Sequence, residues 1–244
     1  GGDGGQIVRP ERPFEITKGL NARHIAMWQS HGRYFNENVN DWTWQRSLLW
    51  QTVEDLYTQS YVLPYLVPML ESAGASVFLP RERDFQTTEI IVDNDGVGYT
   101  ESVGKYSWQV IEDGFAHKKS SYLTGENPFK DGTSRATRSV TAADKQSIAT
   151  WSAKFAKSDD YAVYVSYKTL PNSSHKAQYT VVHKGQKTTF AVNQQMGGGT
   201  WVYLGTFAFD NDKQQNYGSV AAAANGKEVV STDAVTFGGG MGSV

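Results

Sequence analysis

From residue 89 to residue 237 the chain is a series of short strand-like segments separated by turns, and this pattern constrains the fold more than any other feature. In the segment 161–167, side chains at every second position share one face, because side chains alternate across a strand. Turn residues such as Asn225-Gly226 separate the segments. The pattern favours an antiparallel β-sandwich of the jelly-roll kind. We predict strands at 89–93, 105–110, 135–141, 148–155, 161–167, 177–184, 187–193, 200–209, 217–222 and 228–237.

Residues 1–88 show a different pattern, that of a strand, a helix and a second strand. The segments 23–28 and 75–79 are short and apolar, as expected for strands. Between them, apolar residues recur at steps of three and four from about residue 41 to residue 72, which predicts a helix. A strand, a helix and a strand in this order form the βαβ unit of a parallel sheet.

The boundaries of this helix follow from its flanking residues. Asp41 is expected to be the N-cap, and Gly74 stands where the helix should end. Pro64 and Pro68 lie inside the predicted helix and should kink or divide it, because each removes a backbone donor.

These patterns predict an α+β chain in two parts. A partial α/β segment occupies residues 1–88, and the β-sandwich occupies residues 89–237. Two parallel strands and one helix leave sheet edges and an apolar face uncovered. The glycine-rich residues 238–244 have the composition of a linker, so we expect this chain to be a fragment whose C-terminal continuation completes the first part.

The composition excludes several classes of function. A formal net charge of -2, with scattered basic residues, argues against a nucleic-acid partner. No apolar run approaches the roughly 20 residues that span a bilayer. The chain has no cysteine, which excludes disulfides, thiolate metal sites and cysteine nucleophiles. Aromatic residues make up 13% of the chain, a share that suits a β-rich fold and also suits stacking on sugars.

Four segments carry a resemblance to a known family. The stretches YAVYVSY at 161–167, AQYTVVHKG at 177–185, TWVYLGTF at 200–207 and TDAVTF at 232–237 resemble the golvesin/xanthan-lyase carbohydrate-binding-like domain. The resemblance extends over about residues 90–237 in the order and spacing of the family. It implies a β-sandwich, a polysaccharide or peptidoglycan ligand, and an extracytoplasmic location at the cell surface, in the periplasm or outside the cell.

The first part of the chain resembles the N-terminal part of a zinc-dependent N-acetylmuramoyl-L-alanine amidase. The resemblance rests on the strand before Ser30-His31-Gly32, on Glu54 in the helix, and on the second strand with its following Arg81-Glu82-Arg83-Asp84 turn. It implies that His31 and Glu54 are zinc ligands in the full-length protein. The chain lacks the family's Asp-Pro before the histidine turn and its second Ser-X-His segment. We therefore assign no catalytic residue and expect this chain alone to be inactive.

Each metal prediction has a plainer alternative. His31 can be a polar turn residue, and Glu54 a solvated helix position. The turn Asp93-Asn94-Asp95-Gly96 offers oxygen ligands for a structural calcium ion, but an ordinary Asx turn explains it as well. Asp233 interrupts an apolar strand, and we expect it to satisfy buried backbone donors.

Carbohydrate binding requires exposed aromatic rings beside amides or carboxylates. The candidate residues on predicted loops and strand ends are Trp108, Tyr122, Phe129, Asn193, Gln194 and Tyr217. The alternative for each aromatic is a place in the core, and we expect Trp151 and Trp201 to be core residues because they lie inside alternating strands.

Two functions follow from these observations. The chain is expected to be part of an exported bacterial protein that acts on polysaccharide or cell-wall glycan, with a glycan-binding sandwich and half of a zinc hydrolase-like domain. The alternative is a non-enzymatic surface module that binds glycan or serves as a scaffold. The sequence leaves the oligomeric state open.

Overall fold

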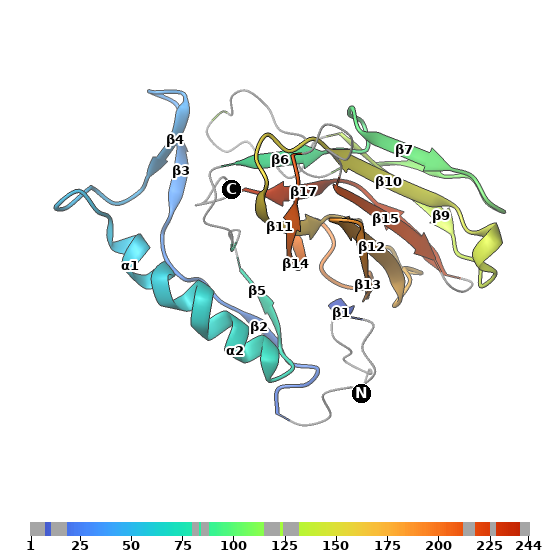
Figure 1. The fold of residues 1–244 in the computed structure, drawn as a ribbon, viewed down its shortest axis with the longest axis horizontal. Coiled ribbons are helices and arrows are strands. Elements are labelled where there is room, and N and C mark those ends of the chain that lie inside the picture. The colour runs from blue at the N-terminus through green and yellow to red at the C-terminus, as the bar shows by residue number, and fades with distance from the viewer. Residues whose placement is uncertain are drawn as a thin grey trace.

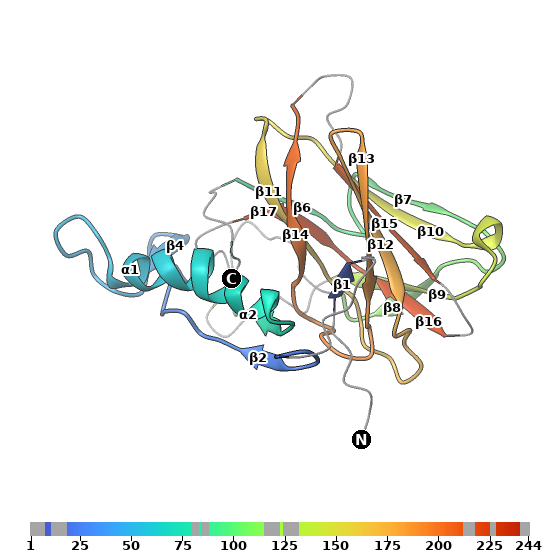
Figure 2. The ribbon, with the colours of Figure 1, turned by 60° about the horizontal axis from the view of Figure 1, so that its bottom comes forward.

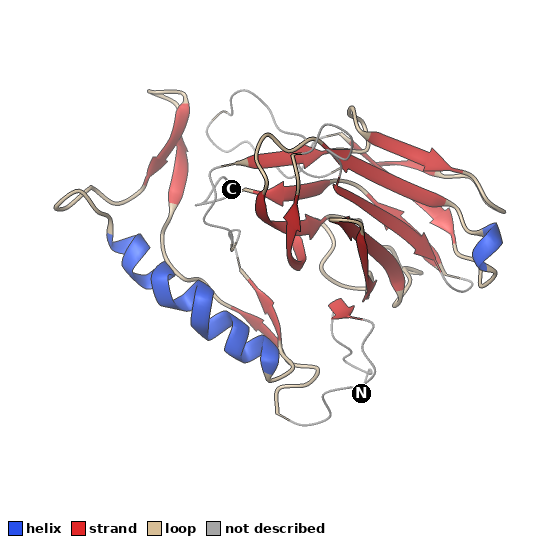
Figure 3. Ribbon diagram, viewed as in Figure 1, coloured by secondary structure: helices blue, strands red, loops and turns tan. Residues whose placement is uncertain are grey.

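The computed structural model describes residues 8–10, 19–79, 83, 88–114, 123, 132–211, 218–224 and 228–239, and structural statements below concern these residues. The described chain has two parts, a large β-sandwich and a smaller α/β segment at its side (Figure 1). Figure 3 shows that the long helical stretch belongs to the smaller part, while strands build the larger one. The predicted fold class, an α+β chain with a β-sandwich, is confirmed.

Three antiparallel sheets build the sandwich (Figure 2). The six-stranded sheet has the order β1 (Val8–Pro10), β13 (Gln186–Val192), β12 (Ala177–His183), β15 (Gly218–Ala224), β10 (Ile148–Ala153) and β7 (Tyr99–Ser102). The four-stranded sheet has the order β14 (Val202–Phe209), β11 (Asp159–Val165), β17 (Val235–Gly238) and β6 (Glu89–Val92). The three-stranded sheet has the order β16 (Val229–Thr232), β9 (Thr133–Arg138) and β8 (Gln109–Glu112), and a short 3-10 helix, η2 (Ala143–Lys145), precedes β10.

One hydrophobic core joins these sheets. Trp151 of β10, Val163 of β11 and Val230 of β16 are all fully buried in it. Four aromatic rings pack together at one end of this core, with centroid distances between 4.5 and 6.1 Å, and they belong to Phe155, Tyr161, Phe209 and Phe237. One face of the segment 161–167 lies in this core, as the alternation predicts, and the residues of its other face are buried as well.

The prediction of one continuous strand at 228–237 is wrong. The chain forms β16 and β17 on either side of Asp233 and Ala234, and the two strands pair in different sheets. At the break, the Ser166 amide donates to the Ala234 carbonyl at 2.9 Å. The Ala234 amide donates to the Ser166 hydroxyl, also at 2.9 Å. A strand that changes sheets must interrupt its own ladder, and these bonds satisfy the interrupted backbone groups.

The predicted strand at 105–110 is also displaced. Residues 99–102 form β7 and residues 109–112 form β8, while the segment between them is a loop. The loop is bonded to residues near η2, through Gly104 N to Ser147 Oγ at 2.9 Å and Lys105 N to Lys145 O at 2.8 Å. These bonds occupy backbone groups that a continuous strand would have used in its ladder.

The smaller part contains the predicted βαβ unit. Strands β2 (His24–Ala26) and β5 (Ser76–Phe78) pair in parallel, and the helical stretch consists of α1 (Glu54–Tyr61), the π-helical turn η1 (Val62–Leu66) and α2 (Val67–Ser72). Pro64 lies in η1, so the prediction that proline divides this helix is confirmed. A small core around Val67, Ala75 and Val77 holds the helical stretch against the two strands. No helix within the described residues is long and apolar enough to cross a membrane.

The predicted start of the helix at Asp41 is wrong. Asp41 is the first residue of β4 (Asp41–Trp44), which forms an antiparallel hairpin with β3 (Arg33–Asn36). The residue before α1 is Val53, which has extended backbone angles and makes no side-chain cap. Aromatic residues and threonine favour a pleated strand, and here this preference outweighs the helical spacing of the apolar residues.

Arg83 joins the smaller part to the sandwich. Its guanidinium binds Glu71 of α2 at 2.7 Å and the Val77 carbonyl of β5 at 3.1 Å. The same guanidinium lies 4.0 Å from the ring centroid of Tyr203 in β14, and the Arg83 amide donates to the Tyr164 hydroxyl at 2.6 Å. One side chain therefore contacts the helix, the parallel sheet and the sandwich.

We expect Arg83→Met to destabilise the protein, because it leaves Glu71 and the Val77 carbonyl without their donor while keeping most of the side-chain length. The expected loss is about 1–3 kcal/mol, measured as the free energy of unfolding in urea. Lys154→Met is the matched control, since Lys154 is exposed on the sandwich. Equal losses in the two variants would show that Arg83 does not join the two parts.

Candidate functional site

The histidine turn after β2 is held by a buried carboxylate. Asp55, at the start of α1, is fully buried, and its Oδ1 accepts the Gly32 amide at 2.8 Å. Gly32 has a positive φ of 71°, which a glycine adopts at little cost. Burial raises the pKa of Asp55, but hydrogen bonds from the Ser30 side chain and from the amides of Gly32 and His31 outweigh it, so this pKa lies below its ordinary value.

The structure brings His31 and Glu54 together. The His31 Nδ1 atom lies 3.3 Å from Glu54 Oε1, and the two side chains are 39% and 62% exposed. Asp55 Oδ1 lies 3.9 Å from the same nitrogen. The placement follows from the fold, because the turn after β2 faces the first turn of α1. The two side chains thus form one exposed polar group.

Arg46, which sequence reasoning missed, completes this group. Its Nη2 lies 2.9 Å from His31 Nε2, and its Nε lies 3.2 Å from Glu54 Oε1. Arginine can only donate, so the ring nitrogen that it meets accepts the bond. The guanidinium therefore uses lone pairs of both His31 and Glu54 that a metal ion would need. No spacing in the sequence relates Arg46 to His31, because the β3–β4 hairpin lies between them.

The described residues do not by themselves complete a zinc site. A zinc site needs at least three protein ligands, and His31 and Glu54 have the right donor atoms but are only two. Over the described ranges, no group of three or more histidine, aspartate or glutamate side chains is arranged to hold a metal ion. A third ligand would have to come from outside these residues.

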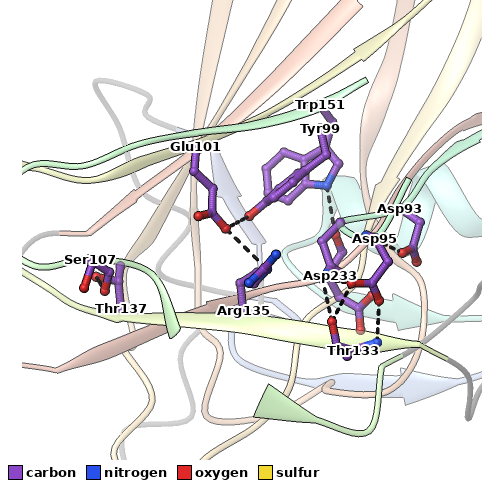
Figure 4. Close-up of polar contacts among 11 residues, drawn as sticks. Asp93, Asp95, Tyr99, Glu101, Ser107, Thr133, Arg135, Thr137, Trp151 and Asp233 are labelled. Carbon is purple, nitrogen blue, oxygen red and sulfur yellow. Dashed lines mark hydrogen bonds and ion pairs between the residues drawn. The ribbon is translucent and has the colours of Figure 1, made fainter. Parts of the chain in front are cut away.

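The turn at 93–96 has the geometry of an Asx turn. The Asp95 amide donates to Asp93 Oδ1 at 2.7 Å, and Asp95 accepts the amide and the hydroxyl of Thr133, each at 2.6 Å. Figure 4 shows Asp95 pointing to Thr133 on β9. The plainer alternative thus accounts for Asp93 Oδ1 and for both Asp95 carboxylate oxygens, and the structural calcium stays a prediction.

Three residues predicted to bind carbohydrate are buried. Trp108 is 6% exposed and belongs to the sandwich core. Gln194 is fully buried and bonds to Tyr179 Oη at 3.0 Å and to both backbone groups of Ser231. Asn193 is 7% exposed, and its side chain accepts the Gln195 amide at 3.1 Å. A buried side chain cannot contact a sugar, so we leave these three out of the binding surface proposed below.

The remaining aromatic predictions divide in two. Tyr122, Phe129 and Tyr217 lie outside the described residues. Trp151 is fully buried, which confirms its place in the core, whereas Trp201 is only partly buried.

A polar group that the sequence did not reveal lies where β7 faces β9, and we call Tyr99, Glu101 and Arg135 the edge site (Figure 4). The Tyr99 hydroxyl donates to Glu101 Oε1 at 2.9 Å, and Arg135 Nε lies 3.4 Å from the same oxygen. The Tyr99 ring packs on buried Trp151, and burial raises the pKa of Tyr99 well above its ordinary value. The charged side chains are partly open, with Glu101 23% and Arg135 25% exposed.

A second group adjoins the edge site. The ring of Tyr106, in the β7–β8 loop, is partly exposed and lies 5.3 Å from Lys105 Nζ and 5.1 Å from the Arg138 guanidinium. The Thr137 hydroxyl donates to the carbonyls of Tyr106 and Ser107 at 3.1 and 3.2 Å. Arg135 and Arg138 belong to the same strand but are three positions apart, so their side chains leave it on opposite faces.

Comparisons with known proteins concern mainly the sandwich. A family model described as the Golvesin C-terminal domain matches residues 90–239. A solved Paenibacillus xanthan lyase is similar with 24% identity and a TM-score of 0.47, over 62% of this chain and 13% of that one. The C-terminal family 22 carbohydrate binding module of Clostridium thermocellum Xyn10B is similar with 13% identity and a TM-score of 0.32, over 60% of this chain and 89% of that one. No curated protein matches the chain.

The buried Asp55 predicts a pH dependence of stability. Its folded-state pKa is lowered, so its contribution is fully present above the ordinary value of 3.8 and is lost as the pH falls through the folded value. Asp55→Asn should cost about 1–3 kcal/mol at pH 7, because an amide is a weaker acceptor for the turn amides. Urea unfolding at several pH values measures the difference in free energy of unfolding between this variant and wild type. The difference should become smaller below pH 3.8.

The neighbouring variant Glu54→Gln is the control, since Glu54 is mostly exposed and makes only surface contacts. Its stability should stay close to that of wild type at every pH. If Asp55→Asn lost the same free energy of unfolding relative to wild type at neutral and at acidic pH, the role of the charged carboxylate would be contradicted.

Proposed function

Because this chain belongs to the golvesin C-terminal domain family over residues 90–239, we propose that its β-sandwich is a carbohydrate-binding module that holds a polysaccharide at the edge site. The observation that supports this site most directly is the Glu101–Arg135 pair, in which both charged groups are fixed and partly exposed. A polysaccharide presents many hydroxyl groups, each of which can donate and accept a hydrogen bond. A carboxylate and a guanidinium side by side offer the matching acceptors and donors.

The unused hydrogen-bonding capacity of the pair supports the proposal. The Tyr99 hydroxyl and Arg135 Nε both contact Oε1 of the Glu101 carboxylate. Within the described part of the chain, Glu101 Oε2 and the two terminal Arg135 nitrogens have no further partner. These atoms are available for sugar hydroxyls without breaking an existing bond.

We expect Arg135→Ala to weaken polysaccharide binding. Loss of a hydrogen bond from a charged donor costs about 1.5–3 kcal/mol, which corresponds to a roughly 10- to 150-fold weaker affinity. Affinity electrophoresis against a panel of soluble polysaccharides, and cosedimentation with purified peptidoglycan, measure the effect. The control is Lys157→Ala, which breaks an ion pair of 2.7 Å with Asp159 elsewhere on the sandwich. Wild-type binding by Arg135→Ala would contradict the site.

We further propose that the protein is extracytoplasmic and that it acts on polysaccharide or cell-wall glycan. The golvesin C-terminal domain relationship supports this proposal for the sandwich. The chain spans only 13% of the length of the xanthan lyase it matches, so the activity of a whole protein is a proposal here. The non-enzymatic surface module remains the alternative, and it needs only the sandwich to bind glycan.

The α/β segment supports a second candidate function, as one part of a zinc hydrolase-like domain. The supporting observation is that His31 and Glu54, which lie 23 positions apart in the sequence, meet at 3.3 Å beside the end of a parallel β-strand. Functional groups often gather at the carboxyl ends of parallel strands. His31 and Glu54 would be two of the zinc ligands, and Arg46 would have to leave both when zinc binds.

We expect His31→Ala to lower the zinc content of the protein. The full-length protein is loaded with excess zinc and dialysed, and the bound metal is measured by atomic emission. The control is His24→Ala. His24 lies in β2, with its ring centroid 6.2 Å from that of Phe78, and it is not one of the two proposed zinc ligands. Unchanged zinc content in His31→Ala would rule out the hydrolase-like assignment.

A further inference from the structure

Two cations on the sandwich are held together by one aromatic ring. Lys105 Nζ and the Arg138 guanidinium lie 5.3 and 5.1 Å from the ring centroid of Tyr106, and both side chains are exposed. Across the described residues, neither cation has a carboxylate within ion-pair distance. Some other basic side chains of the described sandwich are paired, such as Lys157 with Asp159 and Lys184 with Asp210. Lys105 and Arg138 thus form a local positive charge on a chain whose net charge is -2.

The backbone that carries this ring is rigidly placed. The Tyr106 carbonyl accepts the hydroxyls of Thr137 and Ser147, and the Lys105 amide donates to Lys145 O at 2.8 Å. Gly104 packs so closely that a Cβ there would lie 2.3 Å from Lys145 O. Tyr106 is therefore presented in one position before any ligand arrives, which lowers the entropy lost on binding.

We infer that this site selects polysaccharides that carry carboxylate groups, such as those of uronic acids. The inference rests on the proposed function, the binding of polysaccharide by the sandwich, and it names the ligand class. Lys105 and Arg138 would bind the sugar carboxylate, while Tyr106 contacts the sugar ring. Arg138 offers a planar guanidinium that matches a carboxylate with two parallel hydrogen bonds.

The electrostatic balance supports an anion at this place. Two cations near one ring repel each other, and an anion between them removes the repulsion. The nearby acidic groups are accounted for, since Glu101 is paired with Arg135, and Glu228 with His175 at 2.8 Å. Asp144 lies in η2 next to Lys145 and makes no ion pair with either cation. No carboxylate of the described chain takes the position that we assign to the ligand.

The test compares one polymer in two forms, polygalacturonate and its carboxyl-reduced derivative, with dextran sulfate as a third probe. Wild type should bind polygalacturonate at least about tenfold more tightly than the reduced form. The double variant Lys105→Met/Arg138→Met should lose at least about tenfold in affinity for polygalacturonate and much less for the reduced form. Added salt should weaken only the binding of the acidic polymers, because these contacts are exposed to screening.

The outcomes separate this inference from the proposed function. Equal binding of both polygalacturonate forms by wild type would overturn the selectivity for carboxylates and leave polysaccharide binding intact. Equal binding of dextran sulfate and polygalacturonate would also overturn it, since charge alone would explain the result. Absence of binding to every polysaccharide would overturn both. Lys157→Met, which removes a cation elsewhere on the sandwich, should match wild type throughout, and thermal unfolding confirms that each variant is folded.

Discussion

The sandwich depends on a hydrogen bond at the point where one segment changes sheets. Trp151 is fully buried, and its indole N–H donates to the Asp233 carbonyl at 2.8 Å. Asp233 stands between β16 and β17, where its carbonyl is not needed by a strand ladder. A buried indole without a partner would cost stability, and so would a buried carbonyl. The break between β16 and β17 therefore provides a hydrogen-bond acceptor for the buried indole N–H of Trp151, and Figure 4 shows this bond.

The position of the edge site follows from this arrangement. β16 pairs with β9, so the break at Asp233 sets where Arg135 and Arg138 lie relative to the six-stranded sheet. β7 is the outer strand of that sheet, and its Tyr99 packs on the same Trp151 whose indole reaches Asp233. The two strands that supply the edge site are thus both fixed through one tryptophan. A substitution that shrinks this tryptophan would move both sides of the site, not only the core.

The parts of the fold that are predictable from the sequence are those decided by local periodicity. At 161–167 every second side chain lies in the sandwich core, so the pattern is visible without any knowledge of its neighbours, although the other face of the strand is buried too. The split at Asp233 and the β3–β4 hairpin are not predictable in this way, because pairing partners far along the chain decide them. The same holds for the edge site. Glu101 and Arg135 meet only because β7 and β9 face each other, and no spacing in the sequence encodes that contact. The meeting of His31 and Glu54 follows from a family resemblance, whereas Arg46 comes just after a hairpin that the helical pattern concealed.

The α/β segment depends on the sandwich for its stability. Its own core is small, and two parallel strands of three residues each would not persist alone in water. Phe78 of β5 packs against the core of the sandwich, and Arg83 joins α2 and β5 to β14. The turn that carries His31 is in turn anchored to α1 through Asp55. Because these contacts form a continuous chain from the sandwich to the histidine turn, the geometry of the His31–Glu54 pair depends on the sandwich.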